Sequence, residues 1–225
     1  MADLKSSATR NLAHYREIHR TDPRYGRSSQ KLVGLIADAV RAGQATTPGW
    51  APKTLLDFGC GKSQAAERVA RKLGLTHYLY DPAIPGLEEL PVAQADIVMN
   101  TDVLEHLDET EVDLLIGDVR GLTDHAYFNI ATSPASKVLD SGENAHATVQ
   151  PPEWWQARIA AHFPTVVRLP AATNRVSFAT WPISDTHMRR VVAGDLWRRK
   201  ERVKAILCRL GLGQDPLKSG PLAGR

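Results

Sequence analysis

Apolar and polar residues alternate with two different spacings through the middle of this sequence. Short apolar runs at residues 54–58, 77–81 and 96–100 are bounded by turn residues, which is typical of buried strands. Between the first two runs, residues 64–73 have their apolar positions at helical spacing. This succession of strand, helix and strand predicts a parallel sheet covered by helices, and therefore an α/β fold.

The pattern extends the prediction toward both ends of the chain. Residues 28–42 place their apolar positions on one helical face, which we expect to pack on the core. A more polar helical piece is expected around residues 11–19. After the third strand we expect helices at residues 110–121 and 152–163, strands at 126–131, 165–169 and 176–181, and a basic helix at 188–210. From residue 211 onward, glycine and proline predict disorder.

Length and composition suit one α/β domain with extensions, because 225 residues can bury a sizeable core. We expect a helical extension or lid at residues 1–50, the main domain at 51–185, and a basic helix with a flexible tail at 186–225. Two cysteines, Cys60 and Cys208, fit neither a disulfide framework nor a zinc finger, so both should be free thiols.

No stretch approaches the roughly 20 apolar residues that span a bilayer, and the chain start lacks the apolar middle of a secretory signal. We therefore expect a cytoplasmic protein.

Charge is distributed unevenly along the chain. Residues 1–50 carry 8 basic and 4 acidic side chains, residues 186–225 carry 10 basic and 3 acidic ones, and the segment between them is net negative. The basic helix has the composition of a helix lying on an anionic membrane surface, which would place the protein at the inner face of the membrane. It could equally pack on the domain with its arginines in water. Nucleic acid is the less favoured partner, because no stacking aromatics interleave the basic run.

The strongest chemical signal is LLDFGCGKS, residues 55–63, where a buried strand meets a glycine turn at the start of a helix. Glycine permits a sharp turn, and the N–H groups of the next helix face whatever binds there. Asp81 ends the second strand, where a carboxylate can accept hydrogen bonds from a ribose diol. Gln64 replaces the third glycine of a dinucleotide fingerprint, and Leu56 replaces the first glycine of a phosphate-binding loop. These two substitutions disfavour a nicotinamide dehydrogenase and a P-loop protein.

Four stretches in order, LLDFGCGKS, YLYDP, ADIVMNTDVLEHL and AYFNIAT, resemble the motifs of class I S-adenosylmethionine-dependent methyltransferases. The resemblance covers roughly residues 53–170. It implies a Rossmann-like, doubly wound, mostly parallel sheet of seven strands, with the cofactor across the carboxyl ends of the strands. Only PAIPGLEELPVAQA lies between Asp81 and Asp96, so the third unit of the family fold is shortened in this chain.

The resemblance also implies a site for S-adenosylmethionine. Its methionine part would be lined by the glycine turn, that is by Asp57, Gly59, Cys60 and Gly61, and its ribose would be bound by Asp81. The residues after the next strand, Asn100, Thr101 and Asp102, would pass close to its reactive end. Its adenine would be covered by the segment after Asp81, namely Pro82, Ala83 and Ile84.

A finer resemblance concerns the acceptor. DVLEHL together with GENAHATVQPPEWW is similar to an uncharacterised bacterial and phage-borne methyltransferase group associated with surface-polysaccharide genes. Asp102, Glu105, His106 and His146 can converge above the carboxyl edge of the sheet, or the Glu-His pair can simply cap a helix. A hydroxyl acceptor loses its proton as it attacks, so a nearby His or carboxylate is useful. His146 is the first candidate for this base, and Glu105 or His106 the second.

We therefore predict O-methylation of a sugar, a glycan or another small-molecule hydroxyl, in surface polysaccharide assembly. The same four residues also resemble the metal site of small-RNA 3′-end 2′-O-methyltransferases, so a metal-dependent RNA ribose methyltransferase is the alternative. Mixed O and N ligands do not distinguish Mg²⁺, Mn²⁺ and Zn²⁺, and a metal is not favoured. A non-catalytic protein that binds the cofactor or an anionic surface would not need these polar groups at the cleft.

Two aromatic clusters complete the candidates. The first could fold over the cofactor as a lid or form a surface helix, and it contains His14, Tyr15, His19 and Tyr25, followed by Gly26. The second is Trp154 with Trp155, of which at most one should face the cleft, since neighbours on a helix point in different directions. The sequence does not determine the oligomeric state.

Overall fold

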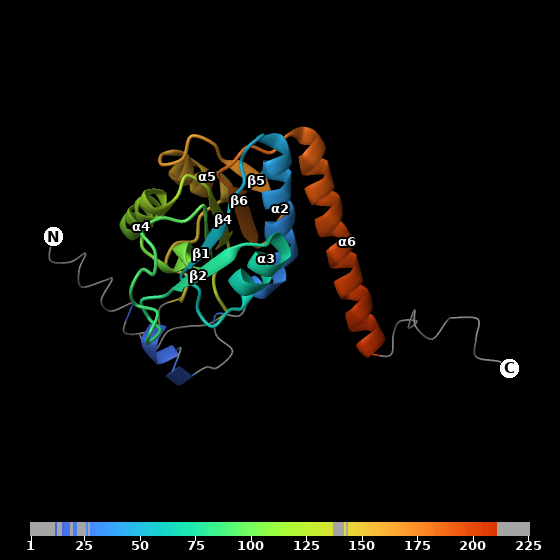
Figure 1. Ribbon diagram of the computed structural model, residues 1–225. Helices are drawn as coiled ribbons and strands as arrows, with labels where there is room; N and C mark the ends of the chain where they lie inside the picture. Colours follow the sequence, from blue (N-terminus) through green and yellow to red (C-terminus); the bar gives the residue numbers. More distant parts are fainter. Residues whose placement is uncertain are drawn as a thin grey trace.

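The computed structural model describes residues 12, 15–18, 20–21, 26, 28–136, 142 and 144–210. In chain order the elements are η1 (Ser28–Leu32), α2 (Val33–Thr46), β1 (Thr54–Phe58), α3 (Ala65–Leu73), β2 (Thr76–Tyr80), β3 (Ile97–Thr101), η2 (Leu104–His106), α4 (Glu109–Leu122), β4 (Ala126–Ala131), α5 (Pro152–Ala160), β5 (Val167–Leu169), β6 (Arg175–Ala179) and α6 (Asp185–Arg209). The α/β fold expected from the sequence is confirmed (Figure 1).

The strands form a sheet in the order β2-β1-β3-β4-β6-β5. β1 is parallel to β2 and β3, and β3 is parallel to β4, while β6 is antiparallel to both β4 and β5. The described part of the chain thus has six strands, and the seventh strand implied by the family is not confirmed. Residues 82–95, where the shortened third unit was expected, contain turns and bends, so β2 is an edge of this sheet.

Helices cover both faces of the sheet, because successive side chains of a buried strand point to opposite sides. Leu55 of β1 packs in a core cluster with residues of α2 and α3, whereas Leu56 packs in a second cluster with residues of α4 and α5. Figure 1 shows α2, α3 and α6 on one side and α4 and α5 on the other. The doubly wound arrangement follows, and α2, although it precedes residue 50, contributes Leu35 and Ile36 to the first cluster.

The register of the sheet determines which residues meet at its carboxyl edge. Phe58 at the end of β1 pairs with Tyr80 at the end of β2. The glycine turn that follows is fixed to β2, since the N–H groups of Gly59 and Cys60 both donate to the Tyr80 carbonyl, at 2.8 and 3.1 Å. The turn therefore lies beside Asp81. In the same way Thr101 of β3 pairs with a residue near the end of β4.

The basic helix α6 runs along α2 and continues past it (Figure 1). Arg198 of α6 forms an ion pair with Asp38 of α2 at 2.6 Å, and Val191 is buried in the first core cluster. Farther along, between residues 192 and 210, seven large apolar side chains are exposed, among them Val192 and Trp197. The other five lie on one face of the helix, at spacings of three, four and seven residues: Leu196, Val203, Ile206, Leu207 and Leu210. Among the described residues, no helix is both long and apolar enough to cross a membrane.

Two expectations concern the ends of the chain. Of the polar helical piece around residues 11–19, residues 12 and 15–18 are described and helical, and the others lie outside the described residues. The tail from residue 211 onward lies outside them as well.

Candidate active site

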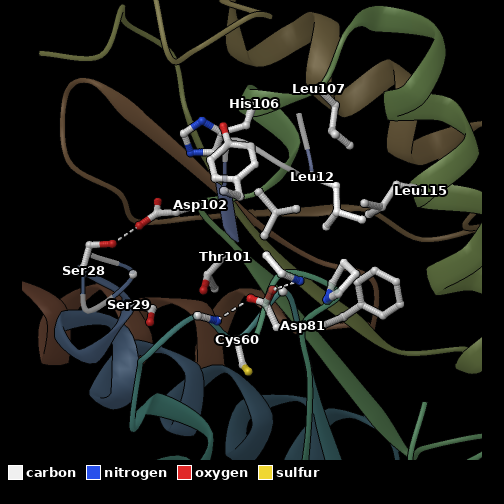
Figure 2. A pocket seen from close by; sticks show the side chains of 18 residues that line it. Leu12, Ser28, Ser29, Cys60, Asp81, Thr101, Asp102, His106, Leu107 and Leu115 are labelled. Atoms are coloured by element: carbon white, nitrogen blue, oxygen red, sulfur yellow. Dashed lines mark hydrogen bonds between the residues drawn. The ribbon is translucent and has the colours of Figure 1, made fainter. Parts of the chain in front are cut away.

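A cavity of about 300 Å³ lies at the carboxyl edge of the sheet (Figure 2). It is bounded by the glycine turn, by the residues that follow β2 and β3, and by residues near the start of the chain. Asp81 and Cys60 lie at one end of the cavity, and Asp102 and His106 lie at the other. We call it the first cavity.

The glycine turn is shaped by close approach to the loop after β3. Gly59 has φ +83° and Gly61 has φ +53°, which is backbone that residues with a Cβ rarely adopt. A Cβ on Gly59 would lie 2.5 Å from Val103 Cγ2. The absence of a side chain at Gly59 therefore lets the turn after β1 pack directly against Val103.

Asp81 lines the first cavity in a fixed orientation. Its Oδ2 accepts from the Gly61 N–H at 2.8 Å, and its Oδ1 accepts from the Ala83 N–H at 2.9 Å. A carboxylate oxygen can accept more than one hydrogen bond, so both oxygens keep acceptor capacity for a diol. Pro82 and Ala83 also line this cavity, whereas Ile84 does not.

Two of the expected cofactor residues lie behind the cavity wall instead of lining it. Asp57 is fully buried, and neither of its carboxylate oxygens has a hydrogen-bond partner among the described residues. Burial, together with the nearby charge of Asp81, raises the pKa of Asp57 to about 8. Asn100 donates from Nδ2 to the Phe58 carbonyl at 2.8 Å, while its Oδ1 has no partner in the described part of the chain. Unpaired polar atoms thus lie beneath the glycine turn.

Cys60 lines the first cavity as a buried free thiol. Burial raises the pKa of this thiol, and the charges of Asp57 and Asp81 raise it further. Because the thiolate is the nucleophilic form, Cys60 is a wall residue and not a reactive one. Cys208 on α6 is also free.

Asp102 connects three elements that are distant in the sequence. Its backbone has φ +59°, a left-handed conformation that Asp tolerates better than most residues. Its carboxylate forms an ion pair with Arg175 of β6 and accepts a hydrogen bond from the Ser28 hydroxyl of η1. Arg175 also donates to Asn129 Oδ1 of β4 at 3.1 Å. Ser28, Arg175 and Asn129 were not expected at the site, since nothing in the local sequence relates them to Asp102.

A second cavity of about 400 Å³ adjoins the first. The two cavities share Gly26, Ser28, Asp102 and His106 as lining residues. The second one is otherwise lined largely by polar residues, including Glu105, Ser133, His146, Asn174 and Arg175. Asp102 and His106 therefore mark the boundary between two compartments.

Glu105, His106 and His146 converge at the second cavity. One ligand atom of each lies within 4.8 Å of the others, and the two imidazole rings meet edge to face with centroids 5.1 Å apart. Burial raises the pKa of Glu105 to about 7 and, with repulsion from His146, lowers that of His106 to about 4. His106 is thus a neutral imidazole at physiological pH. Asp102, the fourth member expected from the sequence, is engaged by Arg175 and Ser28 and is not part of this group.

The remaining candidates lie as follows. Tyr15 and Gly26 of the expected lid line the first cavity, whereas His14, His19 and Tyr25 lie outside the described residues. Trp155 is buried in the second core cluster, and Trp154 stacks against Arg158, whose guanidinium carbon is 4.7 Å from the ring centroid. Neither tryptophan lines either of these cavities.

No protein-family model matches the sequence, and no curated protein matches it either. Among solved structures, a 1,6-didemethyltoxoflavin-N1-methyltransferase from Burkholderia thailandensis, crystallised with S-adenosylhomocysteine, matches with a TM-score of 0.53 and 13% identity. The match covers 79% of this chain and 90% of that one. The chain has the class I methyltransferase fold. At this identity the similarity establishes the fold and leaves the activity to be argued from the site.

Two further solved structures are similar to a lesser degree. The DhpI–S-adenosylhomocysteine complex matches with a TM-score of 0.45 and 14% identity over 76% of this chain and 95% of that one. An O-methyltransferase family protein from Burkholderia thailandensis matches with a TM-score of 0.46 and 16% identity over 67% of this chain. This chain spans 57% of the length of that protein.

Proposed function

We propose that this protein transfers the methyl group of S-adenosylmethionine to a hydroxyl group of a small-molecule or glycan acceptor. The observation that supports this most is the pair of adjoining cavities, which meet at Asp102 and His106. A methyl transfer needs two ligands in contact at one point and separated elsewhere, because the acceptor oxygen must approach the methyl carbon in line with the bond that breaks.

The first cavity suits the cofactor. Asp81 offers carboxylate oxygens to the ribose diol, and Gly59 and Gly61 line the same cavity without side chains of their own. Beneath it the unpaired carboxyl oxygens of Asp57 provide hydrogen-bonding capacity close to the glycine turn. When bound, this cofactor supplies an electrophilic methyl group.

The second cavity suits a polar acceptor. As the acceptor oxygen attacks, the O–CH₃ bond forms, the S–CH₃ bond breaks with its electrons going to sulfur, and the hydroxyl proton leaves. In a site without a metal, the proton acceptor that we propose is Nε2 of His146, since its Nδ1 already donates to the Ser133 carbonyl at 2.6 Å. Asn174 and Ser133 provide further polar groups for a sugar-like ligand. Surface polysaccharide assembly is the setting that we propose, on the resemblance of the sequence motifs.

A transfer assay tests this proposal. The protein is incubated with methyl-labelled S-adenosylmethionine and, separately, with nucleotide sugars, oligosaccharides, small phenols and short RNAs. We expect labelled product with a hydroxyl acceptor of the sugar or small-molecule class. Transfer to the ribose of RNA alone would replace the proposed acceptor, and failure to bind S-adenosylmethionine in calorimetry would refute the function.

We also propose that α6 contacts an anionic membrane surface. The exposed apolar face of α6 (Leu196, Val203, Ile206, Leu207 and Leu210) is bordered by cationic residues at neighbouring helical positions, including Lys200, Arg202 and Lys204. An apolar face flanked by cations matches the boundary between lipid tails and anionic headgroups. This contact would bring the active site close to membrane-attached acceptors.

A further inference from the structure

The three side chains at the second cavity present hydrogen-bond acceptors to one another. Nδ1 of His106 lies 2.7 Å from the Ala145 carbonyl, and Nδ1 of His146 lies 2.6 Å from the Ser133 carbonyl. A carbonyl can only accept, so each Nδ1 must carry the proton of its ring. In the neutral imidazoles each Nε2 is then a hydrogen-bond acceptor with a lone pair.

Glu105 adds a third acceptor to this group. Its Oε1 accepts from the Ala131 N–H at 3.0 Å, while its Oε2 is buried and has no hydrogen-bond partner among the described residues. Two imidazole nitrogens and one unpaired carboxylate oxygen therefore lie close together. Such a set of acceptors suits a bound cation.

We infer that Glu105, His106 and His146 form the binding site of a divalent transition-metal ion. In metal sites the ligating histidine commonly donates its other ring N–H to a backbone carbonyl, which fixes the tautomer and aims the lone pair, and both histidines here have that arrangement. Two imidazoles and one carboxylate favour Zn²⁺, Mn²⁺ or Co²⁺ over Mg²⁺, which prefers oxygen ligands.

The location of the site indicates what the ion does. Three protein ligands leave coordination positions open, and these positions face the second cavity, which all three residues line. This part of the inference rests on the proposed function. The ion binds the acceptor hydroxyl oxygen and lowers its pKa, so that the proton passes to water while the oxygen attacks the methyl group. His146 is then a ligand and no longer the proton acceptor.

Asp102 is the residue that distinguishes this three-ligand site from the four-residue metal site considered from the sequence. Its carboxylate is paired with Arg175 and hydrogen-bonded to Ser28, so it has a cationic partner already. We therefore expect Asp102→Asn to retain metal binding, whereas a four-ligand site would lose it.

The test uses Co²⁺ as a spectroscopic probe and needs neither cofactor nor acceptor. The full chain is purified, stripped with a chelator and titrated with CoCl₂, and visible absorption and calorimetry are recorded for the wild type, His146→Ala, Asp102→Asn and the control His77→Ala. His77 is exposed on β2 and lines neither of the two cavities. We expect one ion per chain, a loss of affinity of at least about 10-fold in His146→Ala, and wild-type binding in the other two variants.

The outcomes separate the site from the function. Absence of binding in the wild type, or equal binding by His146→Ala, overturns the metal site whatever the activity. If the ion binds but the chelated enzyme transfers methyl groups at the full rate, the role of the ion in acceptor activation is overturned and the methyltransferase proposal stands. If neither the loaded nor the stripped enzyme transfers methyl groups to any acceptor, the proposed function fails while the binding site remains.

Discussion

At the scale of single residues, Asp81 is the side chain on which cofactor binding most depends. Its carboxylate is held by the Gly61 and Ala83 N–H groups and faces the first cavity. We expect Asp81→Ala to weaken binding of S-adenosylhomocysteine by about 10- to 100-fold, because hydrogen bonds to a charged group contribute about 1.5–3 kcal/mol. Calorimetry measures this directly. Asp118→Ala is the matched control, since Asp118 is exposed on α4 and lines neither of the two cavities; equal affinity in both variants would refute the ribose assignment.

The raised pKa of Asp57 predicts that the stability of the protein depends on pH. Its folded-state pKa of about 8 lies above its ordinary value of 3.8, so the folded protein retains a proton that the unfolded chain has lost. The free energy of unfolding must then fall as the pH rises from about 4 to about 8. Asp57→Asn removes this titration, and we expect the variant to gain stability relative to wild type on the order of a few kcal/mol between pH 5 and 8.

Urea denaturation at about pH 5 and about pH 8 measures the difference in unfolding free energy between wild type and Asp57→Asn. Glu105, whose pKa is also raised, remains in both proteins and leaves a smaller dependence of the same sign. A wild type whose stability rises relative to Asp57→Asn toward pH 8 would contradict the assignment.

The site residues that could be predicted from the sequence are those whose neighbours in the chain are also their neighbours in space. The glycine turn, Asp81 and the pair Glu105–His106 each follow the end of a strand, and strand ends converge at one edge of a parallel sheet. Arg175 escaped prediction because it lies 73 positions from Asp102, on an antiparallel strand with no motif of its own. The sequence suggested that Asp102 would join the histidines, but its pairing with Arg175 could only be seen once β6 was placed beside β4.

At the scale of secondary-structure elements, α6 carries a testable surface. We expect the full chain to co-sediment with vesicles that contain anionic phospholipid and not with neutral ones, and this binding should weaken with salt because the attraction is electrostatic in part. The double variant Val203→Asp/Ile206→Asp should lose binding without unfolding, since both side chains are exposed.

Leu114→Asp is the control for this experiment, because Leu114 is equally exposed but lies on α4. Binding that survives in the α6 variant, or that is lost equally in the control, would contradict membrane contact through this face.

The elements themselves were largely predictable because buried strands and amphipathic helices have distinct periods. The differences lie at their ends. The helix expected to begin at residue 28 starts as the 3₁₀ turn η1, whose Ser28 and Ser29 hydroxyls bind Asp102 and Ser63. The seventh strand came from the resemblance alone, and the short segment after Asp81 forms turns in its place.

At the scale of the whole molecule, the first cavity is lined both by residues near the start of the chain and by residues at the carboxyl edge of the sheet. Leu12, Tyr15 and Gly26 line it, whereas the two core clusters are drawn from residue 32 onward. We therefore expect a chain that lacks residues 1–27 to keep most of its thermal stability but to bind S-adenosylhomocysteine at least about 10-fold more weakly. Scanning fluorimetry with and without the ligand checks both statements, with deletion of residues 211–225 as the control. Unchanged ligand stabilisation in the shorter chain would contradict a role for the N-terminal residues.

The boundary between the two cavities has a thermodynamic consequence. The Arg175–Asp102 pair belongs to the walls of both, since Asp102 lines each cavity and Arg175 lines the second. A ligand in the second cavity that draws Arg175 toward itself leaves Asp102 without its cation and so alters the charge that faces the first. By linkage, the factor by which an acceptor then changes cofactor affinity equals the factor by which the cofactor changes acceptor affinity. One ion pair thereby couples the two cavities, so that the affinity measured for either ligand depends on whether the other is bound.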